Sequence, residues 1–249
     1  MHSERTELSF ERTDYSLPDH LVAIAKEFAD HFKVRRSYIP DFCRLIQTSK
    51  WWNTLNLEAK LAVWAKGFGS VSGRKGIIDL VIKAFRSCSD DKEIAGLRGA
   101  MVESLVIASR GGSDILDLPA FGWGARITVK TRVAAKELKY ICVAPTHAES
   151  SRTESGEVCR NRSTVDFGSW NGKHAQLYEC KAQPARIGCK EVKYMQYVKS
   201  EMSALDISHE LFFVCADSRE SIEARLEDLG LGPLFKALGA RELAAMMPA

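Results

Sequence analysis

The amino-acid sequence predicts an α/β protein with a central mixed sheet flanked by helices, preceded by a helical module. Apolar residues recur at helical spacing over 1–90. Further along the chain, apolar or β-branched runs of strand length appear, and helical patterns alternate with them. Such an alternation is typical of a sheet covered by helices. We therefore expect a helical N-terminal module at 1–90 and a second domain at 91–249.

Three helices are predicted in the N-terminal module, at 21–32, 57–68 and 77–85. Pro18 and Asp19 are start signals for the first helix, and Asn56 can cap the second. Gly67 and Gly69 are expected to end the second helix. A polar segment after residue 86 then joins the module to the rest of the chain.

The second domain is predicted to mix both kinds of element. In chain order we expect a helix at 94–110, strands at 127–133, 138–143, 163–167 and 175–181, a helix at 191–202, a strand at 210–216, and helices at 221–229 and 234–246. Gly111 and Gly112 are expected to end the first of these helices. Asn171 and Gly172 form a turn signal between two strands and favour a hairpin there. The polar stretch 145–162 is expected to be a loop.

Composition excludes several classes of protein. No run of about 18 apolar residues is present, so a membrane-spanning helix is not expected. The first residues lack the basic start and apolar middle of a secretory signal, which favours a cytoplasmic location. The 7 cysteines include no C-x-x-C pair, and we expect them to be reduced thiols. The formal charge of +3 does not by itself indicate a partner.

Two neighbouring predicted strands carry two acids and an amine. Side chains alternate between the faces of a strand, so Glu179 and Lys181 are expected to share one face. On the preceding strand, Val165 and Phe167 are expected to form the buried face, and Asp166 to project opposite. Because the turn between the strands makes them hairpin partners, Asp166 is expected to lie near Glu179.

The chemistry of this group favours a metal ion. Two close carboxylates resist ionisation unless a cation lies between them. A hard divalent cation such as Mg²⁺, with Mn²⁺ as the alternative, accepts oxygen ligands of this kind. The ion would acidify a bound water and offset negative charge on a phosphate. Lys181 would orient the attacking water or stabilise the developing negative charge.

The acid-x-Lys spacing does not select this site by itself, because it recurs elsewhere in the chain. Three other triplets fall on predicted helices or in the polar linker, beginning at Glu58, Asp90 and Glu191. A rival set, Asp117 with Glu137 and Lys139, also falls near a predicted strand. The rival is followed by a polar loop, whereas Lys181 is followed by a helix and an apolar strand. We therefore favour the later triplet.

Asp166, a spacer and then Glu179-Cys180-Lys181 resemble the signature of the PD-(D/E)xK nuclease superfamily. This superfamily includes restriction endonucleases and many repair, recombination and phage-defence nucleases. Its common core is a helix, three strands, a helix and a further strand, and the elements predicted over 94–216 follow that order. Val165 stands where the family has its nominal Pro. The resemblance implies a restriction-endonuclease-like core in 91–249.

The same resemblance implies a Mg²⁺-dependent endonuclease, with DNA expected as the substrate rather than RNA. Asp166, Glu179 and the backbone carbonyl of Cys180 would bind the metal ion, and Lys181 would assist the attacking water. Phage defence or restriction is the implied setting, although a fold does not fix a function. The helical module would engage the nucleic acid, a protein partner or a second copy of the chain.

Two further residues enter through the resemblance. Glu103 matches an acid on the first core helix that reaches the metal directly or through water. It is the one acid in an apolar stretch of that helix and therefore needs a partner; the alternative is an exposed side chain or an ion pair with Arg98 or Arg110. Gln196 resembles a glutamine that some branches carry on the helix after the lysine strand.

Other interpretations of the sequence stay open. A zinc site from Cys159, Cys180, Cys189 and a histidine is conceivable, but the ligand-pair spacing of such sites is missing. Trp51 and Trp52 fit either base stacking or the core of the helical module. The second functional hypothesis is a non-catalytic nucleic-acid-binding or scaffold subunit that retains the sheet without cutting.

Overall fold

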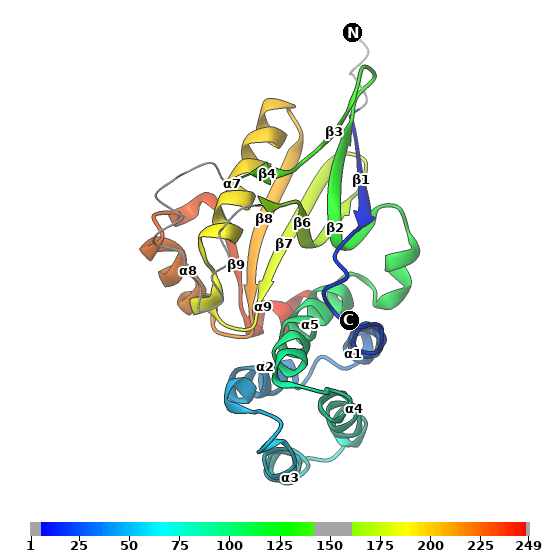
Figure 1. Ribbon diagram of the computed structural model, residues 1–249, viewed down its shortest axis with the longest axis vertical. Helices are drawn as coiled ribbons and strands as arrows, with labels where there is room; N and C mark the ends of the chain where they lie inside the picture. Colours follow the sequence, from blue (N-terminus) through cyan, green and yellow to red (C-terminus); the bar gives the residue numbers. More distant parts are fainter. Residues whose placement is uncertain (1–5, 142–160, 248–249) are drawn as a thin grey trace.

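A mixed sheet of seven strands forms the centre of the described part of the chain, and helices flank it (Figure 1). The structure is a computed structural model that describes residues 6–141 and 161–247. Cys142, His147 and Cys159 lie outside the described residues, as do most of the predicted loop at 145–162 and the end of the strand predicted at 138–143. The α/β class expected from the sequence is confirmed.

The N-terminal part is helical except for its first element. In chain order it contains β1 (Glu7–Arg12), α1 (Asp19–Val34), α2 (Ile39–Thr48), the 3₁₀ turn η1 (Ser49–Trp51), α3 (Leu57–Phe68) and α4 (Lys75–Arg86). The long helix α5 (Asp91–Arg110) follows and leads into η2 (Ser113–Asp117). The side chain of Asp90 caps α5 by accepting the Glu93 N–H.

The rest of the chain alternates strands and helices. It contains β2 (Phe121–Lys130), β3 (Ala135–Glu137), β4 (Tyr140–Ile141), β5 (Asn161–Arg162), β6 (Thr164–Trp170), β7 (His174–Lys181), η3 (Pro184–Arg186), α7 (Cys189–Ala204), β8 (Ser208–Cys215), α8 (Arg219–Asp228), η4 (Gly232–Leu234), β9 (Lys236–Leu238) and α9 (Ala240–Met246).

The strand order of the main sheet is β1-β2-β6-β7-β8-β9, with β3 also paired to β2. The pairs from β1 to β7 are antiparallel, whereas β8 is parallel to β7 and β9 is parallel to β8. The short strands β4 and β5 form a separate antiparallel pair. Since β7 is parallel to β8, helix α7 makes the crossover between them.

Two hydrophobic clusters lie on opposite faces of the sheet. On β7 and β8, the residues of one cluster alternate with those of the other: Tyr178 and Phe212 belong to the first, Leu177 and Phe213 to the second. The first cluster joins that face to α1 through α5 and to α9. The second joins the other face to α7 and α8. The N-terminal helices therefore share one continuous core with the sheet.

Several elements differ from the expectation, including the short strands β3 and β5, which were not predicted. The strand β1 and the helix α2 were not predicted, and β2 begins at Phe121 rather than at residue 127. The predicted helix at 234–246 is shortened, because 236–238 pair with β8 and α9 starts only after Gly239. In the described part of the chain, no helix has both the length and the apolar character that a membrane crossing needs.

A close packing contact fixes β1 against the sheet. Gly122 on β2 and Gly168 on β6 are register partners, and the ring of Phe10 lies over both. A Cβ atom built on Gly168 would lie 2.4 Å from Cε1 of Phe10. Only glycine leaves room for this ring, so β1 and β6 approach closely across β2.

Candidate active site

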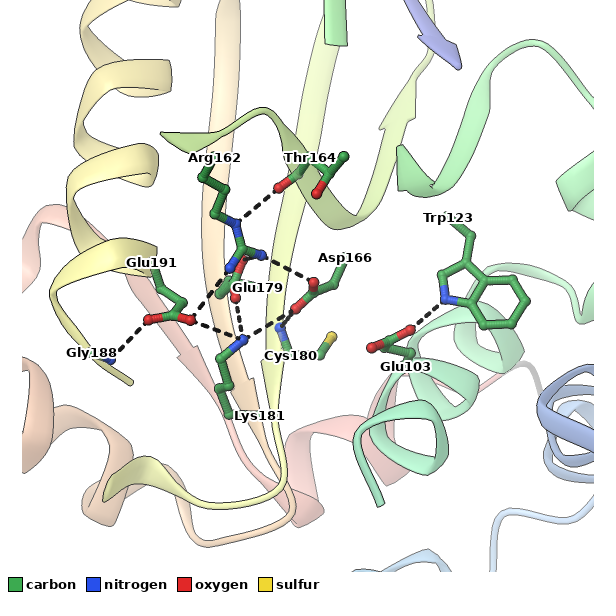
Figure 2. A network of polar contacts seen from close by, with 10 residues as sticks. All are labelled: Glu103, Trp123, Arg162, Thr164, Asp166, Glu179, Cys180, Lys181, Gly188 and Glu191. Atoms are coloured by element: carbon green, nitrogen blue, oxygen red, sulfur yellow. Dashed lines mark hydrogen bonds and ion pairs between the residues drawn. The ribbon is translucent and has the colours of Figure 1, made fainter. Parts of the chain in front are cut away.

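The β6–β7 hairpin brings Asp166 next to β7 near its carboxyl end (Figure 2). The predicted turn is present, with Gly172 at a φ of 87° and the Asn171 side chain accepting the N–H groups of Lys173 and His174. Pairing between the two strands runs from Trp170 to Phe167. Just beyond that register, Oδ2 of Asp166 accepts the Cys180 N–H at 2.6 Å.

Glu179 and Lys181 point to one side of β7, as the strand period predicts, and their side chains form an ion pair. The Lys181 ammonium also lies 3.8 Å from Oδ2 of Asp166. Glu179 is completely buried, with 0% of its surface exposed. A buried carboxylate is stable only when its charge is compensated, and Lys181 supplies part of that compensation.

Arg162 on β5 joins the acids, and the sequence did not predict this. Its Nη2 atom contacts both Oδ1 of Asp166, at 3.1 Å, and Oε2 of Glu179 (Figure 2). Its Nη1 atom lies 3.4 Å from Oε1 of Glu191. Since one guanidinium nitrogen bridges Asp166 and Glu179, it takes the position of a cation shared by these two carboxylates.

Glu191 in the first turn of α7 is the third carboxylate of this cluster. Its Oε1 lies 3.6 Å from the Lys181 ammonium, and its Oε2 accepts the N–H of Gly188 at the start of the helix. We call Arg162, Asp166, Glu179, Lys181 and Glu191 the acid cluster. With all groups ionised, it holds three negative and two positive charges.

The ionisation of the cluster follows from burial and charge together. Burial raises the pKa of Glu179 to about 7; Arg162 opposes this shift, and Asp166 adds to it. Burial acts in the same direction on Asp166, but Lys181 and Arg162 outweigh it and hold the pKa of Asp166 below its ordinary value. Burial lowers the pKa of Lys181, but Glu179 and Asp166 more than reverse this, so Lys181 stays protonated.

Glu103 on α5 lies on the other side of Asp166 (Figure 2). It accepts a hydrogen bond from Nε1 of Trp123 rather than pairing with Arg98 or Arg110. Burial, followed by repulsion from Asp166, raises the pKa of Glu103 to about 8. A carboxyl group with this pKa can accept or donate a proton near neutral pH.

A half-open cavity of about 500 Å³ adjoins these groups. Asp166, Lys181 and Glu103 line it together with the backbone around Cys180, and Trp123 forms part of its wall. Glu179 does not reach the cavity surface, because it lies on the α7 side of β7. The cavity therefore gives solvent and small groups access to one acid of the cluster, its lysine and Glu103.

The remaining predicted residues lie elsewhere. Gln196 is partly exposed on α7 and, within the described residues, contacts neither the acid cluster nor the cavity. Val165 and Phe167 were expected on one face, but they pack in different clusters on opposite faces. β6 pairs with β7 only from Phe167 to Trp170, and we attribute the change of face to the residues before Phe167, which have no register partner on β7.

The rival triplet is not assembled in the described structure. Asp117 ends η2, and Glu137 forms an ion pair with Arg126 at 3.2 Å. No contact within the described residues brings Asp117 to Glu137 or Lys139. The zinc alternative includes Cys159, which lies outside the described residues.

No family model matches the sequence, and no curated protein matches it. Among solved structures, the chain is similar to protein VC1899 from Vibrio cholerae, with 12% sequence identity and a TM-score of 0.41. The match covers 98% of this chain and 57% of that one, so this chain spans less than two thirds of that protein's length. At these values the similarity assigns neither a fold family nor a function.

The carboxylate oxygens of Asp166 and Glu179 are of the type that binds a hard cation, but they already contact Arg162 and Lys181. Within the described residues, no group of three or more His, Cys, Asp or Glu side chains is close enough to hold a metal ion. Asp166 and Glu179 instead share Nη2 of Arg162. The pKa of Glu179 nevertheless stays above its ordinary value beside two cations, so Arg162 and Lys181 do not fully offset the cost of burying this charge.

The sequence carries a signal for Glu191 but none for Arg162. Glu191 is the third residue of α7, and this helix begins shortly after β7, the strand that carries Lys181. Its carboxylate therefore lies near the end of β7. Its acid-x-Lys triplet falls on a predicted helix, whereas the strand pattern favours the triplet at Glu179. Arg162 precedes Asp166 by four residues, and no periodicity indicates that its side chain folds back onto two strands.

Proposed function

We propose that the protein is a metal-dependent nuclease that hydrolyses phosphodiester bonds, with DNA as substrate rather than RNA. The observation that carries the proposal is the convergence of Asp166, Glu179 and Lys181 next to a cavity lined by Asp166 and Lys181. We take as further support that α5, β2, β6, β7, α7 and β8, with β3, β4 and β5 between β2 and β6, follow the chain order of helix, three strands, helix and strand that the resemblance implies.

Asp166, Glu179 and the carbonyl of Cys180 would hold Mg²⁺ or Mn²⁺, and Glu103 would complete the shell or serve a second ion. When bound, the metal would supply an acidified water and positive charge for the phosphate. Because Arg162 now occupies oxygens of both Asp166 and Glu179, its guanidinium would have to give up at least one of these contacts.

The chain's own residues then have separate roles. The Lys181 ammonium stays charged, and it would orient a water molecule or stabilise negative charge at the phosphate. Where Glu103 does not ligate an ion, its pKa near 8 would let it accept or donate a proton across the cavity. Trp123 fixes the Glu103 carboxylate through its indole N–H and covers one side of the cavity.

A cytoplasmic role in phage defence or restriction is our proposal for the biological setting. It rests on the resemblance of the Asp166 and Glu179-Cys180-Lys181 pattern to that nuclease superfamily, and function remains a property of the site rather than of the fold.

The second candidate is a non-catalytic nucleic-acid-binding or scaffold subunit, and the position of Arg162 favours it. A guanidinium that bridges Asp166 and Glu179 gives a self-contained network that needs no metal. In that case Glu179, buried and doubly paired, would serve to hold β5 to β7, and Glu191 would join the same two cations to α7.

A plasmid-nicking assay with Mg²⁺ or Mn²⁺ separates the two candidates. We expect wild type to nick and relax supercoiled DNA, and Glu179→Gln and Lys181→Ala to lose this activity while still binding DNA in EDTA. Glu210→Gln is the matched control, because Glu210 pairs with Lys236 on the exposed part of the sheet. Binding to DNA without any metal-dependent cutting by wild type would contradict the proposal and favour the scaffold.

A further inference from the structure

Three arginines outside the acid cluster line the same cavity and come from three separate elements. Arg12 ends β1, Arg98 lies on α5 and Arg186 ends η3. Within the described residues, none of the three forms an ion pair with a carboxylate. Arg186 is exposed, whereas Arg12 and Arg98 are half-buried, and a half-buried cation without a counter-charge needs an explanation.

Arg98 and Arg186 lie close enough to repel each other. Burial lowers the pKa of Arg98, and the positive charge of Arg186 lowers it further. Arg98 donates one hydrogen bond, at 2.6 Å, to the carbonyl of Ser49, which holds its side chain in place. An anion between the two guanidinium groups would remove the repulsion.

Arg12 is also held at the cavity wall, and one of its hydrogen-bond donors has no partner in the described part of the chain. Its guanidinium carbon lies 4.6 Å from the centre of the Trp123 ring, so a cation–π contact orients the side chain. Its Nε atom is buried and has no hydrogen-bond partner in the described part of the chain. A buried donor without a partner is rare in proteins, so the described residues do not use the full hydrogen-bonding capacity of this guanidinium.

The face of α5 that meets the cavity carries small residues, which leave space for a ligand. Ala95, Gly96, Gly99 and Ala100 line this face. A Cβ atom built on Gly99 would meet no atom closer than Oε1 of Glu103, at 3.9 Å. The helix therefore presents open space between Arg98 and Glu103 rather than filling it.

We propose that Arg12, Arg98 and Arg186 form a binding site for backbone phosphates of a nucleic acid, beside the phosphate that meets Asp166 and Lys181. This inference rests on the proposed function and names the residues that hold the substrate. Guanidinium groups match the oxygens of a phosphate in pairs, and three of them around one half-open cavity suit a chain that enters and leaves. Asp14 also lines the cavity, but its carboxylate forms no ion pair with Arg12, Arg98 or Arg186 in the described structure and accepts the Ser16 N–H instead, so the three guanidinium groups keep their charge for an anion.

Fluorescence anisotropy in EDTA tests the proposal, because EDTA allows binding without cutting. The probe is a short fluorescein-labelled DNA duplex. We expect Arg186→Gln and Arg98→Gln to weaken binding by roughly tenfold or more each. Each should also reduce the slope of log K against log salt concentration by about 0.9. Arg219→Gln is the matched control, since Arg219 pairs with Glu223 on α8 outside the cavity.

Arg186→Gln is the decisive variant, because the Arg186 side chain has no hydrogen bond or ion pair among the described residues that its loss could disturb. A melting temperature equal to that of wild type will establish that it folds. Gly99→Met keeps every charge but fills the cavity, and we expect it to weaken binding as well.

The outcomes separate this inference from the proposed function. Duplex binding by Arg186→Gln and Arg98→Gln that matches the Arg219→Gln control would overturn the inference, whether or not wild type cuts DNA. Inorganic phosphate, a mononucleotide and unlabelled duplex would each be added as competitors at equal total phosphate concentration. If the small phosphates displace the probe as well as the duplex does, the site binds small phosphates and the inference is overturned. Loss of binding in both variants supports it even if no metal-dependent cutting is found.

Discussion

Replacing Arg162 by methionine should destabilise the protein far more than the loss of one charge would suggest. The Arg162 side chain is 10% exposed, and it neutralises the fully buried Glu179 as well as Asp166. Removing one partner of a buried ion pair costs about 3–5 kcal/mol, because a charge is left uncompensated. In a chain of this size each kcal/mol shifts the melting temperature by about 2–4 °C. We therefore expect a decrease of roughly 6–20 °C.

The matched control is Arg86→Met, which also removes one guanidinium. Arg86 is 58% exposed and pairs with Glu58 on the surface of the helical part. Exposed pairs contribute little to stability, so its melting temperature should stay close to that of wild type. Thermal unfolding followed by circular dichroism in EDTA measures both variants.

Divalent cations and pH extend the same test. With the guanidinium gone, Mg²⁺ can take the place between Asp166 and Glu179, so adding it should raise the melting temperature of Arg162→Met more than that of wild type. Losing Arg162 should also raise the pKa of Glu179 above its present value of about 7. The folded variant then takes up this proton at a higher pH than folded wild type does, so its deficit should shrink as the pH falls from above the variant's raised pKa to about 7.

Equal melting temperatures for Arg162→Met and Arg86→Met would refute this account of the acid cluster. A deficit that does not respond to Mg²⁺ or to pH would leave Arg162 with a packing role only.

Two other predictions concern Glu103 and the glycine pair under Phe10. Because the pKa of folded Glu103 is raised to about 8 from an ordinary 4.5, the folded state holds a proton that the unfolded chain has lost, and stability falls as the pH rises between these values. Glu103→Gln should therefore match wild type near pH 5 in EDTA and become the more stable protein by a few kcal/mol at pH 9; denaturant unfolding at both pH values measures this, and a pH-independent difference would contradict it. Gly168→Ala should lose about 1–3 kcal/mol, since its Cβ would meet the Phe10 ring at 2.4 Å. Gly67→Ala is the control, with no atom within 4 Å of the new Cβ, and the double variant Phe10→Leu/Gly168→Ala should recover part of the loss.

The sequence was most informative where side-chain pattern and turn chemistry agreed. The period of two on β7 placed Glu179 and Lys181 on one side, and Asn171-Gly172 joined that strand to the one bearing Asp166. Helices such as α1 and α5 were also predicted, because their apolar residues repeat along one stripe. These features depend on local spacing, which a sequence shows directly.

Long-range features could not be predicted in this way. The strand β1 has only Leu8 and Phe10 as apolar residues, and it is a strand because it pairs with β2, far along the chain. Gly122 and Gly124 concealed the start of β2, since glycine normally weakens a strand; Gly122 is needed here for the Phe10 ring. The helix α2 was missed although its apolar spacing is helical and Pro40 marks its start.

The site itself was predicted in composition but not in arrangement. Asp166, Glu179 and Lys181 meet as expected, yet Glu103 and Glu179 lie on opposite sides of β7. Arg162 was missed because its role depends on β5 turning its side chain toward both hairpin strands. Gln196 was predicted only from a family pattern. In this protein its position on α7 leaves it partly exposed and away from the acid cluster.

The antiparallel pairing of β1 with β2 also bears on how the molecule assembles. Residues 7–12 must remain unpaired during synthesis until residues 125–130 have emerged, and long-range pairing of this kind closes late in folding. Because Arg12 and Asp14 belong to the wall of the cavity, the wall is incomplete until that strand docks. Ribosome-bound chains that end before β2 therefore carry the first strand without the rest of the cavity wall, and the cavity takes shape only when the sheet has formed.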